Sequence, residues 1–215
     1  MSRPVTLKRK LEDGSLLSAT FAPDKGMNLM SYRKDKIEVI DQSTRSLFDE
    51  RAAGLGALIG PHFHRLADEL LPETPPDDTL FPHIPKERAA GQKDVFSHGI
   101  GRYVPWQASH DETSIKGRIS SIDNYEGVLL GDLEGENFVM TFSAELQEDG
   151  LQIDLSVKTD RSGLIGLHYY YAIDPEHSFV KSVIQNIYND QGEFKPLPDE
   201  WTERDIHHLK FDLNR

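Results

Sequence analysis

Two neighbouring segments with two-residue alternation constrain the fold of this chain more than any other feature. Every second residue is apolar in residues 138–146 and again in residues 151–157, and Glu148-Asp149-Gly150 joins the two segments. Alternation with a period of two places the apolar side chains on one face of a strand, and a short glycine-containing connection joins antiparallel strands. These segments predict a β-hairpin with one buried and one wetter face, as in an antiparallel sandwich. The apolar positions are Phe138, Met140, Phe142, Ala144 and Leu146, then Leu151, Ile153, Leu155 and Val157.

Other segments add short strands to this hairpin. Residues 16–21, 27–32 and 37–40 are apolar and partly β-branched, and turn residues such as Pro23-Asp24-Lys25-Gly26 separate them. The same pattern predicts strands in residues 106–110, 114–122 and 164–173, whereas residues 43–53 favour a short helix. We therefore expect an all-β fold.

Length and charge limit the class of protein. The chain has 215 residues, no cysteine and a formal net charge of -12. This length suits one all-β domain, so we expect a single domain over residues 1–215. An acidic chain repels phosphate backbones, which argues against a nucleic-acid partner. The lack of cysteine excludes disulfides and cysteine-ligated zinc, and it is typical of the reducing cytosol.

Targeting signals are not visible in the sequence. Residues 1–6 lack the apolar run of a signal peptide, and no stretch has the apolar length that a membrane-spanning helix needs. We expect a cytoplasmic protein with no membrane partner. The sequence does not indicate an oligomeric state.

A long connection separates two histidine-containing segments. Residues 66–95 contain five prolines and no sustained periodicity, apart from a short helix that residues 66–71 favour. Connections of this length in compact domains are usually functional or disordered. Because it lies between Arg65 and His98, we expect it to form a wall or lid of a site that contains both.

The segment 96–106 carries the densest group of chemically useful residues. It combines a histidine, two glycines, an arginine and two aromatic residues besides Phe96. Histidine moves protons near neutral pH, and arginine binds oxygen atoms through several donors. A tight turn with a chance histidine is the simpler interpretation of His98, and a core position is the simpler interpretation of Trp106.

Three segments together resemble the aldose 1-epimerase (galactose mutarotase-like) family. The segment 98–102, His-Gly-Ile-Gly-Arg, with Trp106 after it, is similar to the family's His-Gly-aromatic-Gly/Ala-Arg motif and its tryptophan. His168 and the tyrosines after it resemble the family's His-Pro-Tyr-Phe strand, and Arg65 resembles the arginine of its Asn-Arg-Ile turn. The three matches occur in the family's order.

This resemblance implies a twisted antiparallel β-supersandwich of the galactose mutarotase-like type, with an open sugar cleft and no cofactor. It implies a monosaccharide substrate and interconversion of the α and β anomers of a hexose by acid–base ring opening. In the family the histidine matching His168 is the general acid, the one matching His98 bonds near the ring oxygen, and the arginine matching Arg65 holds hydroxyls. The other expected substrate-binding residues are His64, Arg102 and Tyr170.

The family's general base has no match in this chain. In the family it is a glutamate late in a longer chain, and Glu200, Glu203 and Asp212 lack the expected neighbours. The chain therefore resembles the N-terminal two-thirds of such an enzyme, with the C-terminal part missing, and activity would need a base supplied beyond Arg215. A non-catalytic carbohydrate-binding relative is the first alternative.

A metal-binding jelly roll is the second alternative. Two histidines, His62 and His64, are two residues apart and would share one face of a strand, where His98 would complete a ligand set. Simpler interpretations also remain for the other candidates. His168 would be a half-buried strand residue, Tyr170 a packing residue, and Arg65 the partner of Asp68 or Glu69.

Overall fold

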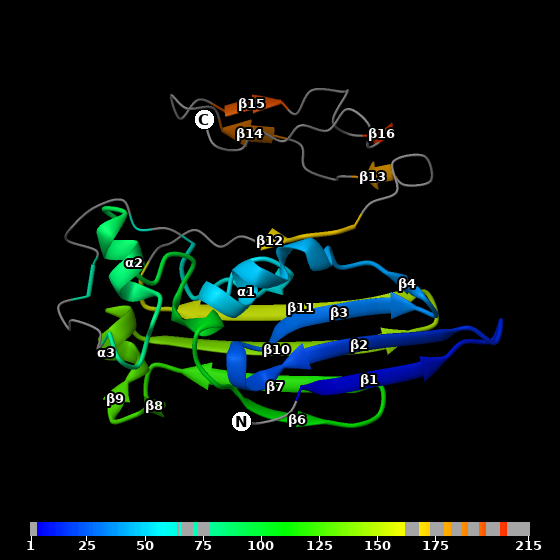
Figure 1. Ribbon diagram of the computed structural model, residues 1–215, viewed down its shortest axis with the longest axis horizontal. Coiled ribbons are helices and arrows are strands. Elements are labelled where there is room, and N and C mark those ends of the chain that lie inside the picture. Colours follow the sequence, from blue (N-terminus) through cyan, green and yellow to red (C-terminus); the bar gives the residue numbers. More distant parts are fainter. Residues whose placement is uncertain are drawn as a thin grey trace. The chain divides into compact units, whose positions relative to one another are not determined.

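The computed structural model describes most of the first 172 residues and four short strands after them (Figure 1). The described residues are 4–63, 65, 71–72, 78–161 and 168–172, with the strand backbones of 179–181, 186–188, 194–196 and 203–205. The chain divides into two compact units, residues 1–171 and 172–215. The single domain expected over residues 1–215 stays a prediction.

The first unit contains a six-stranded antiparallel sheet, and the N-terminal meander supplies its first strands. Its main path runs in the order β1-β2-β3-β5-β12, and β4 pairs with β3. All of these pairs are antiparallel. The strands are β1 (Val5–Lys10), β2 (Leu16–Ala22), β3 (Asn28–Lys34), β4 (Ile37–Glu38), β5 (Gly56–Ala57) and β12 (His168–Tyr169).

The predicted hairpin lies at the centre of a second antiparallel sheet, whose order is β11-β10-β7-β6. Its register is unbroken from the pair Phe138 and Thr159 to the pair Gln147 and Gly150. The strands are β6 (Gln107–His110), β7 (Ser114–Ser120), β10 (Phe138–Gln147) and β11 (Gly150–Thr159). The hairpin is therefore confirmed.

The two sheets pack against each other through the apolar faces that the alternation predicts. The rings of Phe21 on β2 and Phe142 on β10 meet edge to face, with centroids 5.7 Å apart. Trp106 packs against the same Phe142 ring. Burial of one such phenylalanine stabilises the fold by about 2 kcal/mol. The expected fold class, an all-β antiparallel sandwich, is confirmed, and no sheet closes into a barrel among the described strands.

Short helices fill the connections between the strands. The helix expected within residues 43–53 is α1 (Arg45–Arg51), preceded by the 3-10 turn η2 (Gln42–Thr44), where the Asp41 carboxylate accepts a hydrogen bond from the Ser43 N–H at 2.9 Å. The other helical elements are η1 (Pro23–Lys25), α2 (Ile84–Ala89), η4 (Ile100–Arg102) and α3 (Leu130–Glu134), and a small hairpin joins β8 (Asn124–Tyr125) to β9 (Val128–Leu129).

Two sequence expectations for this unit need correction or stay open. The connection 66–95 contains the helix α2, which the sequence did not predict, whereas residues 66–70 lie outside the described part. Of the strand expected at residues 164–173, the structure describes only β12 and the bridge of Tyr171 to Ile40.

The second unit contains two antiparallel strand pairs. One pair joins β13 (Phe179–Lys181) to β16 (Glu203–Asp205), and the other joins β14 (Asn186–Tyr188) to β15 (Phe194–Pro196). The alternating residues 209–213 and the candidate acids Glu200 and Asp212 lie outside the described residues.

Candidate functional site

The segment that follows β5 packs against the turn at residues 98–101, so the segment that leads to Arg65 lies beside the segment that carries His98. The Gly60 N–H donates to the His98 carbonyl at 2.9 Å, and the Gly101 N–H donates back to the Gly60 carbonyl at 3.0 Å. This close approach requires glycine at position 99, because a Cβ there would lie 2.1 Å from the Gly60 oxygen. On the other side of β5, the backbone of His168 pairs with Ala57.

His98 occupies a strained backbone position and has a fixed ring. Its φ is 71°, in the left-handed region that side chains other than glycine rarely adopt. The ring Nδ1 donates to the Phe63 carbonyl at 2.8 Å, and the His98 backbone N–H donates to the same oxygen at 3.0 Å. Because a carbonyl oxygen only accepts, Nδ1 carries the proton, and in the neutral ring Nε2 is the basic nitrogen. His98 thus lies in a turn, and the hydrogen bond from Nδ1 fixes the orientation of its ring.

Arg65 lies in a buried ionic cluster. Its Nη2 donates to Glu134 Oε1 at 2.8 Å and to Glu136 Oε1 at 3.0 Å. The Arg65 side chain is 6% exposed and that of Glu134 is 0% exposed. The simpler interpretation is a surface ion pair with Asp68 or Glu69; those acids lie outside the described residues, but the burial of Arg65 shows that it is not a surface residue. Arg65 Nη1 is buried and has no hydrogen-bond partner among the described residues.

His62 lies between two carboxylates of the same cluster. Its Nε2 contacts Asp94 Oδ2 at 2.9 Å, and its Nδ1 is hydrogen-bonded to Glu134 Oε1. Burial lowers the pKa of His62, but the hydrogen bonds from its ring to Asp94 and Glu134 outweigh burial and raise that pKa to about 9. His62 is therefore protonated at neutral pH, and both of its N–H groups donate.

Glu134 connects this cluster to the segment 96–106. Its second oxygen accepts a hydrogen bond from the Ile100 N–H at 3.0 Å. One carboxylate at the end of α3 therefore fixes His62, Arg65 and the turn that carries His98. We call His62, Arg65, Asp94, Glu134 and Glu136 the Glu134 cluster. Sequence reasoning missed its three acids, because nothing local distinguishes them from the chain's other carboxylates.

Arg102 is held at the opposite end of the same segment. Its Nη2 donates to the Ser97 carbonyl at 2.7 Å and to the Tyr103 hydroxyl at 2.6 Å. The His83 ring stacks on Tyr103 at a centroid distance of 4.2 Å. Trp106 is 5% exposed and its Nε1 donates to the Gly101 carbonyl at 2.8 Å, so its core position is confirmed.

The remaining candidates are less fully described. Tyr170 is 39% exposed, and its backbone N–H donates to the Leu55 carbonyl. His64 lies outside the described residues, and of His168 only the backbone is described. The structure thus brings Arg65, His98 and Arg102 into one connected region, and the roles of all six candidates stay predictions.

A metal ion fits the Glu134 cluster poorly. Atoms of His62, Glu134 and Glu136 lie within 4.8 Å of one another. However, the Arg65 guanidinium already bonds both glutamates, and each nitrogen of the His62 ring carries a proton that a carboxylate accepts. A protonated imidazole is not a metal ligand, because ligation needs a free lone pair. The arrangement therefore gives no support to the metal-site alternative through His62.

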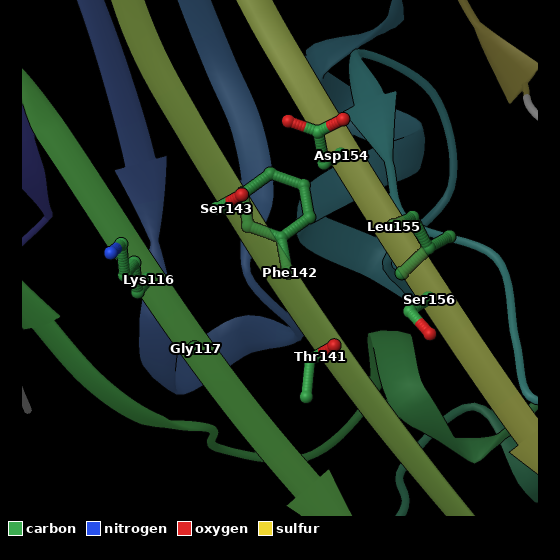
Figure 2. Close-up of a pocket in the computed structure, with 8 residues that line it drawn as sticks. All are labelled: Lys116, Gly117, Thr141, Phe142, Ser143, Asp154, Leu155 and Ser156. Carbon is green, nitrogen blue, oxygen red and sulfur yellow. The ribbon is translucent and has the colours of Figure 1, made fainter.

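A separate depression lies on the polar face of the four-stranded sheet (Figure 2). Its volume is about 550 Å³, and none of the six candidate site residues lines it. The lining is rich in hydroxyl groups, with no aromatic side chain besides Phe142. It comprises Lys116, Gly117, Thr141, Phe142, Ser143, Asp154, Leu155 and Ser156.

Comparisons with known proteins give similarity to solved structures alone. No protein-family model matches the chain, and no curated protein matches it. The fold is similar to a galactose mutarotase-like protein from Clostridium acetobutylicum, with a TM-score of 0.41 and 15% identity over 73% of this chain and 49% of that one. It is also similar to a 4-alpha-glucanotransferase from Thermococcus litoralis, with a TM-score of 0.36 and 14% identity over 75% of this chain and 25% of that one. The match thus spans about half of the first structure and a quarter of the second, and neither likeness assigns an activity to this chain.

Proposed function

We propose that this chain is a hexose-binding protein of the aldose 1-epimerase type, which interconverts the α and β anomers of its sugar. The observation that supports this most is the fixed ring of His98. Its Nδ1–H is committed to the Phe63 carbonyl at 2.8 Å, so Nε2 is the nitrogen that could act on an anomeric hydroxyl. Such a fixed tautomer is what acid–base chemistry on a sugar requires.

The proposed roles follow the chemistry of ring opening. A base removes the proton of the anomeric hydroxyl while an acid protonates the ring oxygen, and the opened aldehyde closes again on its other face. We assign the acid to His168 and the contact near the ring oxygen to His98. To Arg65 we assign the binding of sugar hydroxyls. His64, Arg102 and Tyr170 would complete the contacts to the sugar.

The general base decides between catalysis and binding alone. Glu134 is a poor candidate, because its two oxygens already accept hydrogen bonds from His62, Arg65 and the Ile100 N–H. The Glu134 side chain is also 0% exposed, so neither oxygen is placed to take a proton from a sugar. A non-catalytic carbohydrate-binding protein is therefore the second candidate, and it uses the same residues without the base.

Mutarotation of freshly dissolved α-D-glucose and α-D-galactose, followed by polarimetry, separates the two candidates. Catalysis predicts a rate above that of buffer, and His168→Gln should lower the catalysed rate by about 10²–10⁴-fold. His110→Gln is the matched control, because His110 is an exposed residue on β6. Saturable sugar binding in calorimetry without acceleration of mutarotation would support the non-catalytic binding protein. A protein that shows no binding and no acceleration would contradict both candidates.

A further inference from the structure

The outer edge of β11 differs from the other edges of the two sheets. Edge strands expose unpaired backbone groups, and proteins usually protect them by short length, lysines, prolines or bulges. At the other edges, β12 has two residues, β6 has four, and β1 ends in Lys8-Arg9-Lys10. β11 has ten residues, contains no proline and pairs with β10 without a register shift. It is therefore long and is interrupted neither by proline nor by a bulge, and Lys158 is its one lysine.

The turn of the hairpin determines which backbone groups of β11 face outward. Gln147 and Gly150 close a two-residue turn, so they form a hydrogen-bonded pair and Gly150 points its N–H and C=O toward β10. Even-numbered residues therefore bond to β10, and odd-numbered residues direct their N–H and C=O to the free edge. Consistently, the Leu151 backbone bonds the Tyr32 hydroxyl. Within the described part of the chain, no strand pairs with the groups of residues 153–159 on that edge.

The side chains of β11 form one apolar and one polar row. From residue 151 to residue 158, the odd-numbered residues are half-buried hydrophobic residues that pack on the core, and the even-numbered residues are exposed. Figure 2 shows Asp154 and Ser156 on β11 beside Ser143 and Thr141 on β10. The apolar row comprises Leu151, Ile153, Leu155 and Val157, and the polar row comprises Gln152, Asp154, Ser156 and Lys158.

Two opposite charges in the polar row have no ionic partner within the described residues. Asp154 accepts a hydrogen bond from the Gln152 amide at 3.0 Å, and neither Asp154 nor Lys158 forms an ion pair with a described residue. They lie on the same face, two residues on either side of Ser156. An antiparallel strand of the same sequence with its twofold axis at Ser156 would therefore place each Asp154 opposite a Lys158.

We infer that β11 docks a second copy of this chain, through antiparallel pairing of β11 with β11 about a twofold axis at Ser156. This register also places Leu155 opposite Val157, so the apolar rows of the two copies continue each other. Pairs of residues 155 with 157 and 153 with 159 form about eight backbone hydrogen bonds across the axis. A twofold interface of this kind closes on itself and gives a dimer rather than a fibre.

Pairing of opposite charges favours a twofold axis at Ser156 over an axis at either of the two preceding residues. An axis at Asp154 would place the two Asp154 carboxylates opposite each other, and like charges directly opposite destabilise a strand pair. An axis at Leu155 would leave Asp154 opposite Ser156 and Lys158 opposite Gln152. Only the axis at Ser156, among these three, forms two Asp–Lys pairs. The inference is independent of the proposed sugar chemistry.

A cysteine scan tests the register directly, because the chain has no cysteine. In the proposed dimer the two residues at position 156 form a non-hydrogen-bonded pair with Cα atoms about 4.5 Å apart, which a disulfide bridges. Ser156→Cys should therefore form a covalent dimer under mild oxidation. Thr141→Cys is the matched control, since Thr141 lies on the same polar face one strand further from the edge. Equal cross-linking of the two variants would overturn the inference.

Charge reversal tests the same interface in solution by light scattering or sedimentation of the full chain. Asp154→Lys or Lys158→Asp should each weaken dimerisation about tenfold or more at low salt, because two attractive pairs become repulsive. The variant with both substitutions should recover most of the affinity, and Lys116→Asp on β7 should have no effect. The inference would be overturned if the wild-type chain is monomeric at about 100 µM, or if neither single charge reversal changes the affinity of the dimer.

Discussion

Among the residues of the candidate site, substitution of Glu134 should lower the stability of the fold most. Its carboxylate neutralises two buried cations and also holds the Ile100 N–H. Removing one charge from such a network leaves the others buried without a counter-charge, so Glu134→Gln should lower the free energy of unfolding by about 3 kcal/mol. Urea denaturation measures this loss. The exposed neighbour Asp132 on α3 supplies the control Asp132→Asn, and an equal loss in the two variants would contradict the cluster's role.

His62 should make stability depend on pH in the alkaline range. Its pKa is raised to about 9 in the folded protein from an ordinary value of 6.5. The protonated ring contributes its full stabilisation below pH 6.5, and this contribution is lost as the pH rises through about 9. The free energy of unfolding should therefore fall by about 3 kcal/mol over this window. A flat profile for the wild type would contradict this, and His62→Gln should remove most of the slope.

The Glu134 cluster could not be predicted from the sequence because its contacts are long-range. Glu134 is 72 residues from His62 in the chain, and Asp94 is 32 residues from it. An acid in a short helix and another in a loop carry no periodic signal, so only the folded backbone shows that they meet. His98, in contrast, has two glycines within three residues, and that local pattern is typical of the tight turn that is the simpler interpretation of His98 from the sequence.

At the scale of elements, the turn at Gly99 should tolerate no side chain. Gly99 and Gly91 have nearly the same positive φ, 83° and 80°, but a Cβ at Gly91 would meet no atom within 4 Å. Gly91→Ala should therefore cost about 1 kcal/mol of backbone strain alone. Gly99 also has a ψ of 154°, in a region that is essentially restricted to glycine, and a Cβ there would clash with Gly60, so Gly99→Ala should cost about 3 kcal/mol or more. Equal losses in urea denaturation would show that the close approach of the two segments does not contribute to stability.

The sequence predicted those elements whose signal is local. The β10–β11 hairpin follows from period-two alternation across a two-residue turn, and α1 follows from a short helical segment between strands. The helix α2 was missed because it lies among prolines, although Pro85 in its first turn is compatible with a helix start. The pairing of β12 with β5 joins segments far apart in the chain, and two residues give too little pattern to predict it.

At the scale of the whole molecule, dimerisation through β11 should appear as concentration-dependent stability. A dimer that dissociates on unfolding gains stability with protein concentration. The Tm of the wild type should therefore rise over a hundredfold increase in concentration, whereas that of Asp154→Lys should stay nearly constant. Differential scanning calorimetry at several concentrations measures both, and equal dependence in the two proteins would contradict the proposed interface.

The general class of the molecule was accessible from sequence, but the assembly of its parts was not. Alternation alone predicted antiparallel sheets, and the two sheets pack through the predicted apolar faces. Among the residues that the structure describes, no helix has the length and apolar content to cross a bilayer. Sheet order and the free edge of β11 depend on tertiary pairing, which a pattern of single strands does not specify.

Nitrogen NMR of the histidine rings can test whether the turn that carries His98 binds a hexose. During titration with D-glucose or D-galactose, the His98 Nε2 resonance should shift saturably while Nδ1 keeps its proton, because Nδ1 remains bonded to the Phe63 carbonyl. The exposed His110 should not respond. Unchanged His98 ring resonances at sugar concentrations up to about 100 mM would contradict hexose binding at this turn.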